Sequence, residues 1–109
     1  MVPISVKVYP NNRVKEILAA IPKGHTHLRL ALIFDDQAIV LHEATVAAIV
    51  RAYIDIVLHP SRRGIRLRGR YMSSNERKHG YAKYQLVEDT EYSEDDVIKD
   101  IMDLLGMEK

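Results

Sequence analysis

Arginines recur at every second position of the stretch GIRLRGR, residues 64–70. Successive side chains of an extended strand point to opposite faces, so Arg66, Arg68 and Arg70 are expected to share one face. A guanidinium group is planar and binds phosphate oxygens through two parallel hydrogen bonds. Three like charges in a row repel one another unless an anion compensates them. The spacing therefore favours recognition of a phosphate backbone.

The arginine row belongs to a longer basic stretch, residues 59–84. This stretch holds eight of the sixteen Lys and Arg residues, one acidic residue and three of the six tyrosines. Unpaired bases stack on aromatic rings, and basic groups with interleaved rings are typical of surfaces that bind single strands without reading their sequence. The pattern does not distinguish DNA from RNA. The residues that we predict to form the binding surface are Arg62, Arg63, Arg66, Arg68, Arg70, Arg77, Lys78, Tyr81, Lys83 and Tyr84.

A structural role for the same residues remains open. The net charge is +1 over residues 1–58, +7 over 59–84 and −7 over 85–109, so the acidic segment could neutralise the basic one within the molecule. Exposed strands also carry Arg and Lys simply to discourage edge pairing. The alternation by itself favours a core position for Tyr71 and Tyr84, whereas for Tyr81 it favours stacking.

Other reactive side chains offer little catalytic chemistry. His25 and His27, in HTH, could form a metal pair but lack a third nearby ligand. His42 and Glu43 could act as an acid–base pair, but a capping role at the start of a helix is favoured. There is no phosphate-cradling glycine loop and no nucleophile elbow. We therefore expect no catalytic residues, no metal and no cofactor, which favours a binding module over an enzyme.

Length and composition set the outer bounds. A chain of 109 residues, 47% hydrophobic and 28% charged, is expected to be one globular domain, residues 1–109. The absence of cysteine excludes disulfides and Cys-based zinc sites. The N-terminus lacks signal-peptide features, and the apolar segment 44–58 is interrupted by Arg51 and Asp55, so no membrane span and a cytoplasmic location are expected. The composition leans towards a thermophile.

The periodicity of the first half predicts a strand, a helix and a hairpin. ISVKVY, residues 4–9, alternates as a half-buried strand does. Val14, Ile17, Leu18 and Ile21 then repeat at helical spacing, and Pro22 ends that helix. The runs HLRLALIF and AIVL flank the turn DDQ, where Asp35 and Asp36 suit a hairpin connection.

The second half predicts two helices and a second hairpin. A largely apolar helix over 42–58 is expected to be central in the fold. Strands over 65–71 and 81–87 are expected to pair as a basic hairpin. Ser93 and Asp96 form a capping box that begins an acidic helix over 93–106. The predicted order is β-α-β-β-α-β-β-α, an α+β fold in which helices cover one antiparallel sheet of four to five strands.

A family resemblance points to the same function. The segments VLHEATVAAIVRAYIDIVLHP, RRGIRLRGR and GYAKYQLVE, within residues 27–88, resemble the archaeal ThermoDBP-related proteins, a single-stranded nucleic-acid-binding family of hyperthermophiles. The resemblance implies an α+β domain that binds single strands in an apolar cleft with a basic rim. It would place Arg62, Arg63, Arg66, Arg68 and Arg70 on the rim, and Tyr81 and Tyr84 in the cleft. The long C-terminal coiled-coil helix of the larger members has no counterpart here.

A second resemblance supports an alternative function. The order of elements around LALIFDDQAIVLHEATVAAIVRAYIDIVL is similar to that of the small dimerising subunit of the archaeal KEOPS tRNA-modification complex. This resemblance implies a scaffold or assembly subunit that uses residues 1–58 as a dimer interface, but it leaves the basic half unexplained. A homodimer is thus an open expectation, and single-stranded DNA or RNA is the expected partner.

Overall fold

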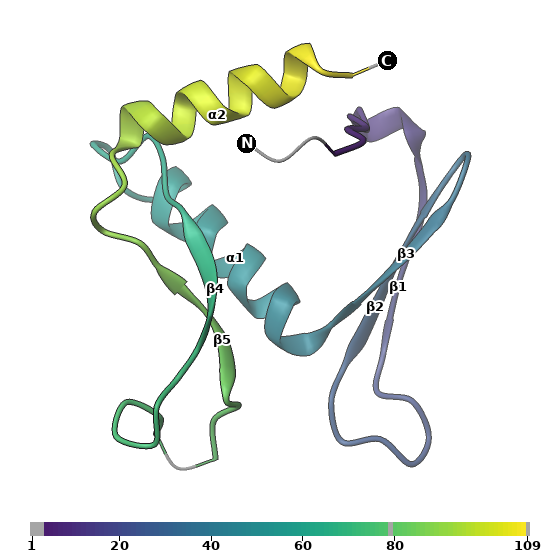
Figure 1. The fold of residues 1–109 in the computed structure, drawn as a ribbon. Coiled ribbons are helices and arrows are strands. Elements are labelled where there is room, and N and C mark those ends of the chain that lie inside the picture. Colours follow the sequence, from purple (N-terminus) through teal and green to yellow (C-terminus); the bar gives the residue numbers. More distant parts are fainter. Residues whose placement is uncertain (1–3, 79, 109) are drawn as a thin grey trace. The chain divides into compact units, whose positions relative to one another are not determined.

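The computed structural model describes residues 4–78 and 80–108 (Figure 1). It is an α+β protein with two α-helices and two antiparallel sheets. The chain divides into two compact units, Met1–Val46 together with Lys99–Lys109, and Ala47–Ile98. We describe each unit by itself. The expected single sheet of four to five strands is replaced by one sheet of three strands and another of two.

The first sheet is formed by β1 (Val14–Ala20), β2 (Arg29–Phe34) and β3 (Ala38–His42), in that spatial order. The β2–β3 hairpin was predicted and is confirmed, with Leu30 opposite Leu41 and the backbone N–H of Phe34 bonded to the carbonyl of Gln37 across the turn. Both faces of the sheet carry aliphatic side chains.

The predictions for residues 4–21 are wrong in both element types. Residues 4–10 form no strand, and the predicted helix is a short 3₁₀ turn, η1 (Asn11–Arg13), followed by strand β1. Antiparallel pairing with β2, through a turn at Pro22–His25 in which Gly24 has a φ of 82°, gives β1 backbone partners that outweigh its helical side-chain spacing. Local propensity is a weak prior that tertiary pairing overrides.

Side chains rather than backbone hold residues 7–13 against the β2–β3 turn. The ring of Tyr9 stacks on Phe34 at 3.7 Å between centroids, and its hydroxyl donates to Asp36 at 3.0 Å. Lys7 also binds Asp36, at 2.6 Å, and Arg13 forms a two-pronged pair with Asp35. These cations hold the pKa values of both aspartates below their ordinary range. The acids of the turn therefore have a structural function.

Both helices predicted for the second half are confirmed, with shifts of a residue or so at their ends. Helix α1 spans Glu43–Val57, and α2 spans Glu94–Gly106, where the Ser93 hydroxyl accepts the Asp96 N–H at 3.1 Å as the capping box requires. Ala48 is the one buried residue of α1 among those described. Within the described residues, neither helix has the length and apolar character needed to cross a membrane.

The second sheet is the predicted basic hairpin, although its strands begin later than the predicted residues 65 and 81. Strand β4 (Leu67–Tyr71) pairs with β5 (Tyr84–Glu88), and Gly69 lies opposite Leu86. Backbone bonds from Met72 to Lys83 and from Asp89 to Arg66 extend the ladder beyond both ends. Figure 1 shows the two strands side by side with the 72–83 connection at one end of the hairpin. We call that end the tip and the opposite end, near residues 66 and 89, the base.

Candidate nucleic-acid interface

Acidic side chains neutralise the arginines at the base of the hairpin. Arg62 pairs with Glu88 at 2.8 Å and approaches Glu94 at 4.0 Å. Arg66 pairs with Asp89 at 3.2 Å, and its guanidinium lies 4.3 Å from the centroid of the Tyr92 ring. The structural role that the sequence left open, neutralisation by the acidic segment, is therefore realised for these two arginines.

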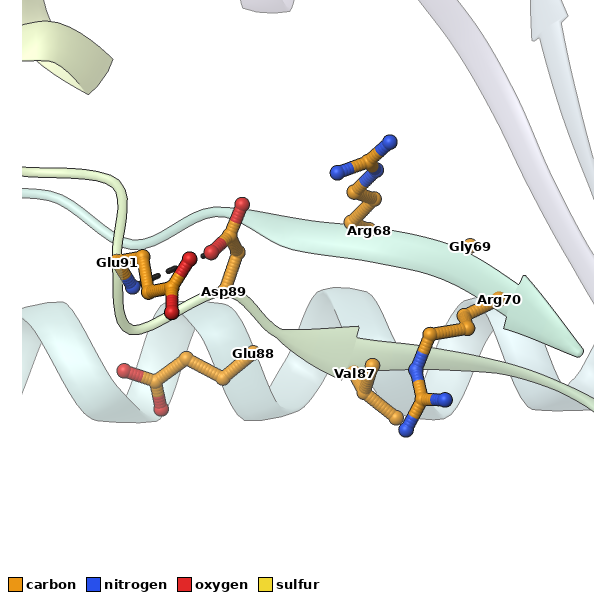
Figure 2. A pocket seen from close by; sticks show the side chains of 7 residues that line it. All are labelled: Arg68, Gly69, Arg70, Val87, Glu88, Asp89 and Glu91. Atoms are coloured by element: carbon orange, nitrogen blue, oxygen red, sulfur yellow. Dashed lines mark hydrogen bonds between the residues drawn. The ribbon is translucent and has the colours of Figure 1, made fainter. Parts of the chain in front are cut away.

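A pocket of about 350 Å³ lies on the hairpin, between arginine and carboxylate side chains. It is lined by Arg68, Gly69, Arg70, Val87, Glu88, Asp89 and Glu91. Figure 2 shows the three carboxylates gathered at one end of this pocket and the two arginines along β4, with Arg68 and Arg70 extending in different directions. Three acids against two arginines make the acidic end unfavourable for phosphate. Phosphate contacts are favoured only where the arginines lie.

Arg70, near the tip, has its acidic partner in the connecting loop rather than in the acidic segment. The guanidinium of Arg70 donates twice to Glu76, at 2.7 and 3.2 Å. Glu76 also accepts the Ser73 N–H at 3.0 Å, while the Glu76 N–H donates to the Ser73 hydroxyl at 3.3 Å. The bond from Arg70, reinforced by those from Ser73, lowers the pKa of Glu76 to about 2. This is a capping-box arrangement within the connecting loop.

Five other cations of the hairpin, all among the described residues, have no acidic partner there. In the part of the chain that the structure describes, no ion pair involves the side chains of Arg63, Arg68, Arg77, Lys78 or Lys83, and all five are exposed. His79, which the sequence places beside Lys78, lies outside the described residues. From Arg70 to Tyr84 the described side chains include four cations and one acid. Positive charge is thus concentrated at the tip.

Tyrosines accompany the cations at the tip. Tyr71 and Tyr84 lie opposite each other in the ladder, with ring centroids 4.9 Å apart in an edge-on arrangement. They are 75% and 50% exposed, so the prediction that they face a core is wrong. Tyr81, in the loop, is 59% exposed. Three tyrosine rings are therefore accessible within one loop and the strand ends that it joins.

Gly69 has a specific role in positioning the Tyr84 ring. A β-carbon added at Gly69 would lie 1.8 Å from the Tyr84 hydroxyl and 2.5 Å from its ring carbon Cζ. The tyrosine thus lies diagonally across the backbone of Gly69, a close approach that only a residue without a side chain permits. The alternating pattern of residues 64–70 did not predict this role for Gly69.

The face assignment of the hairpin separates cations from rings. Arg68 and Arg70 lie opposite Val87 and Gln85, on the face that does not carry Tyr71 and Tyr84. The predicted common face is confirmed for Arg68 and Arg70, whereas Arg66 lies before Leu67, the first residue of β4. The ribbon therefore offers guanidinium groups on one face and aromatic rings on the other.

Glu43 contacts one of the histidine candidates and a backbone N–H. Glu43 contacts Nδ1 of His27 at 3.3 Å, rather than His42, and accepts the Leu28 N–H at 2.9 Å, which lowers its pKa. Glu43 thus ties the start of α1 to the segment before β2. Among residues 4–78 and 80–108, no group of three or more His, Cys, Asp or Glu side chains could hold a metal ion.

Sequence reasoning missed two residues of the tip, Tyr71 and Glu76. Tyr71 was assigned to the core from its alternation, although its position beside a polar loop was a signal of exposure. Glu76 was recognisable from the motif SSNE, because Ser and Glu three apart form a capping box.

Comparison with protein-family models, curated proteins and solved structures found no match for this chain.

Proposed function

We propose that this protein binds single-stranded nucleic acid, DNA or RNA, at the tip of the β4–β5 hairpin and with little sequence specificity. The proposal rests on one observation: among the described residues, exposed cations without ion pairs and exposed tyrosine rings occur together at that end of the hairpin. In this function the cations contact phosphates and the rings stack against unpaired bases. A non-enzymatic role is part of the proposal.

The proposal assigns unequal roles to the predicted residues. Arg68, Arg77, Lys78 and Lys83 contact the backbone, and Arg70 joins them once it is released from Glu76. Arg62 and Arg66 contribute little, because their guanidinium groups are already bound to carboxylates that would also repel phosphate. The side chain of Arg63 has no ion pair among the described residues, but its backbone N–H donates to Glu94 near the acidic base, so its contribution is secondary.

Fluorescence anisotropy with labelled single strands over a salt series tests this function. The logarithm of the binding constant is expected to fall linearly with the logarithm of salt concentration, with a slope of about −0.7 for each phosphate neutralised. Four to five contacts, made by Arg68 and the cations of the tip, give an expected slope of roughly −3. Absence of binding at low salt contradicts the proposal.

A pair of double variants locates the binding surface. Arg77→Ala with Lys78→Ala removes two tip cations, and Lys15→Ala with Lys23→Ala removes two exposed cations of the other unit. The tip variant should weaken binding to all sequences and make the salt slope less steep by about 1.4. The control variant should bind as the unmodified protein does. Equal losses in both would indicate attraction to net charge alone.

An assembly role is the second candidate, supported by the apolar surface of helix α1. The exposed apolar side chains of this helix are Ile49, Val50, Tyr53, Ile54 and Val57. Exposed apolar patches of this kind mark interaction sites in many proteins. Sedimentation equilibrium tests it: a strictly monomeric chain at high concentration that binds no partner protein counts against the assembly role.

A further inference from the structure

We infer that Glu76 is a built-in competitor of the ligand: its carboxylate occupies Arg70 in the free protein and is displaced when a strand's phosphate binds. The inference rests on the proposed function and concerns its regulation at the same tip.

The geometry of the pair supports substitution by phosphate. Two nitrogens of the Arg70 guanidinium donate to the two oxygens of Glu76, at 3.2 and 2.7 Å. A phosphate group presents paired oxygens to the same planar fork, so it can take the place of the carboxylate without moving the arginine. Both side chains are well exposed, which makes the pair weak in water and open to exchange.

The contacts of Glu76 with Ser73 explain how the carboxylate is held beside Arg70. One carboxylate oxygen accepts the Ser73 N–H, and the Ser73 hydroxyl and carbonyl accept the Glu76 N–H. The carbonyl of Ser73 also accepts the Arg77 N–H at 3.1 Å. The turn that holds Glu76 therefore also carries Arg77, so displacement of Glu76 alters the segment that presents this tip cation.

Glu76 differs from the acids at the hairpin base in its sequence distance from its partner. Arg62 and Arg66 are paired with Glu88 and Asp89, more than twenty residues away and anchored in or beside β5. Glu76 is six residues from Arg70 and lies in a loop. Release of a loop carboxylate needs no separation of strands, so this pair is the exchangeable one.

Replacement of Glu76 by glutamine distinguishes its competition with phosphate for Arg70 from its hydrogen bonds with Ser73. The amide oxygen of Glu76→Gln can still accept the Ser73 N–H, but it no longer forms an ion pair with Arg70. The variant is expected to bind labelled single strands roughly threefold or more tightly at low salt. Glu91→Gln removes one exposed carboxylate from the same hairpin region and is expected to give a smaller gain.

A double-mutant cycle with Arg70→Ala makes the test specific. If Glu76 acts by occupying Arg70, the gain from Glu76→Gln disappears in the Arg70→Ala background. A gain that persists there shows only general charge repulsion and overturns the inference. Thermal melts verify that each variant is folded, and Arg70→Lys, which keeps the charge without the fork, provides a second background.

The failure of this inference is distinguishable from that of the proposed function. Binding by the unmodified protein without any gain in Glu76→Gln rejects the competitor role and leaves single-strand binding intact. No binding by either protein at low salt rejects both.

Discussion

Replacement of Tyr71 by alanine tests whether the tip stacks bases. Tyr71 is 75% exposed and contacts Tyr84 edge-on. Stacking of one base on an aromatic ring contributes about 1–3 kcal/mol, so its loss should weaken binding by roughly 5- to 150-fold. The slope of affinity against salt should not change, because no phosphate contact is removed.

The same substitution should have a small effect on stability. The edge-on pair contributes at most about 0.5–1.5 kcal/mol, and the exposure of Tyr71 places it at the lower end, which corresponds to a fall in Tm of about 2–4 °C. Fluorescence anisotropy and thermal melts by circular dichroism therefore measure separable effects. A loss of affinity with a nearly unchanged Tm indicates direct contact with the ligand.

Two further variants complete this test. Tyr71→Phe should bind as the unmodified protein does, because stacking requires the ring and not the hydroxyl. Tyr53→Ala, which removes a tyrosine that is 63% exposed on α1, should leave affinity unchanged. If Tyr71→Ala binds within twofold of the unmodified protein while removal of tip cations weakens binding, the rings do not stack and the surface recognises phosphates alone.

Other substitutions and a pH titration test the remaining parts of the site and fold. Arg68→Ala should make the salt slope less steep by about 0.7 without changing Tm, since it removes a cation that has no ion pair; an unchanged slope places the strand elsewhere. Gly69→Ala should displace the Tyr84 ring, weaken single-strand binding and shift the ring's NMR signals, whereas unchanged signals contradict the close approach. Because the folded pKa of Glu76 is depressed from 4.5 to about 2, its contribution to stability is complete above pH 4.5 and lost as the pH falls through 2; a carboxyl NMR titration with a midpoint near 4.5 contradicts the ion pair. Asp36→Asn should lower Tm, because the lysine and tyrosine that bind this carboxylate hold residues 7–13 in place; an equal Tm rules out that role.

The register of the hairpin explains why acids neutralise some of the arginines and not others. Alternation along GIRLRGR fixed which side chains share a face, and the ladder between β4 and β5 agrees with it. Alternation gives no information about which acids lie across the ladder. Glu88 and Asp89 reach Arg62 and Arg66 only because β5 pairs with β4 in the observed register, with Glu88 opposite Leu67.

Local signals were sufficient where an element's own residues determine it. Ser93 and Asp96 define the start of α2 through hydrogen bonds that span three residues, and Asp35 and Asp36 mark a turn between two apolar runs. The arginine alternation specifies a strand because its period of two is incompatible with a helix. These features depend on neighbours in sequence, so the sequence by itself determined the α+β class, both helices of the second half and the two hairpins.

The tertiary structure alone decided the features that depend on distant partners. Residues 14–20 have a helical spacing of apolar side chains, yet they form β1 because β2 offers backbone hydrogen bonds along its length. Exposure of Tyr71, neutralisation of Arg66 by Asp89 and the position of Tyr84 over Gly69 likewise result from pairing between segments that the sequence separates. Pairing between distant segments decides which of several locally possible structures forms. The number of cations and tyrosines could therefore be read from the sequence, but the end of the hairpin at which they are accessible could not.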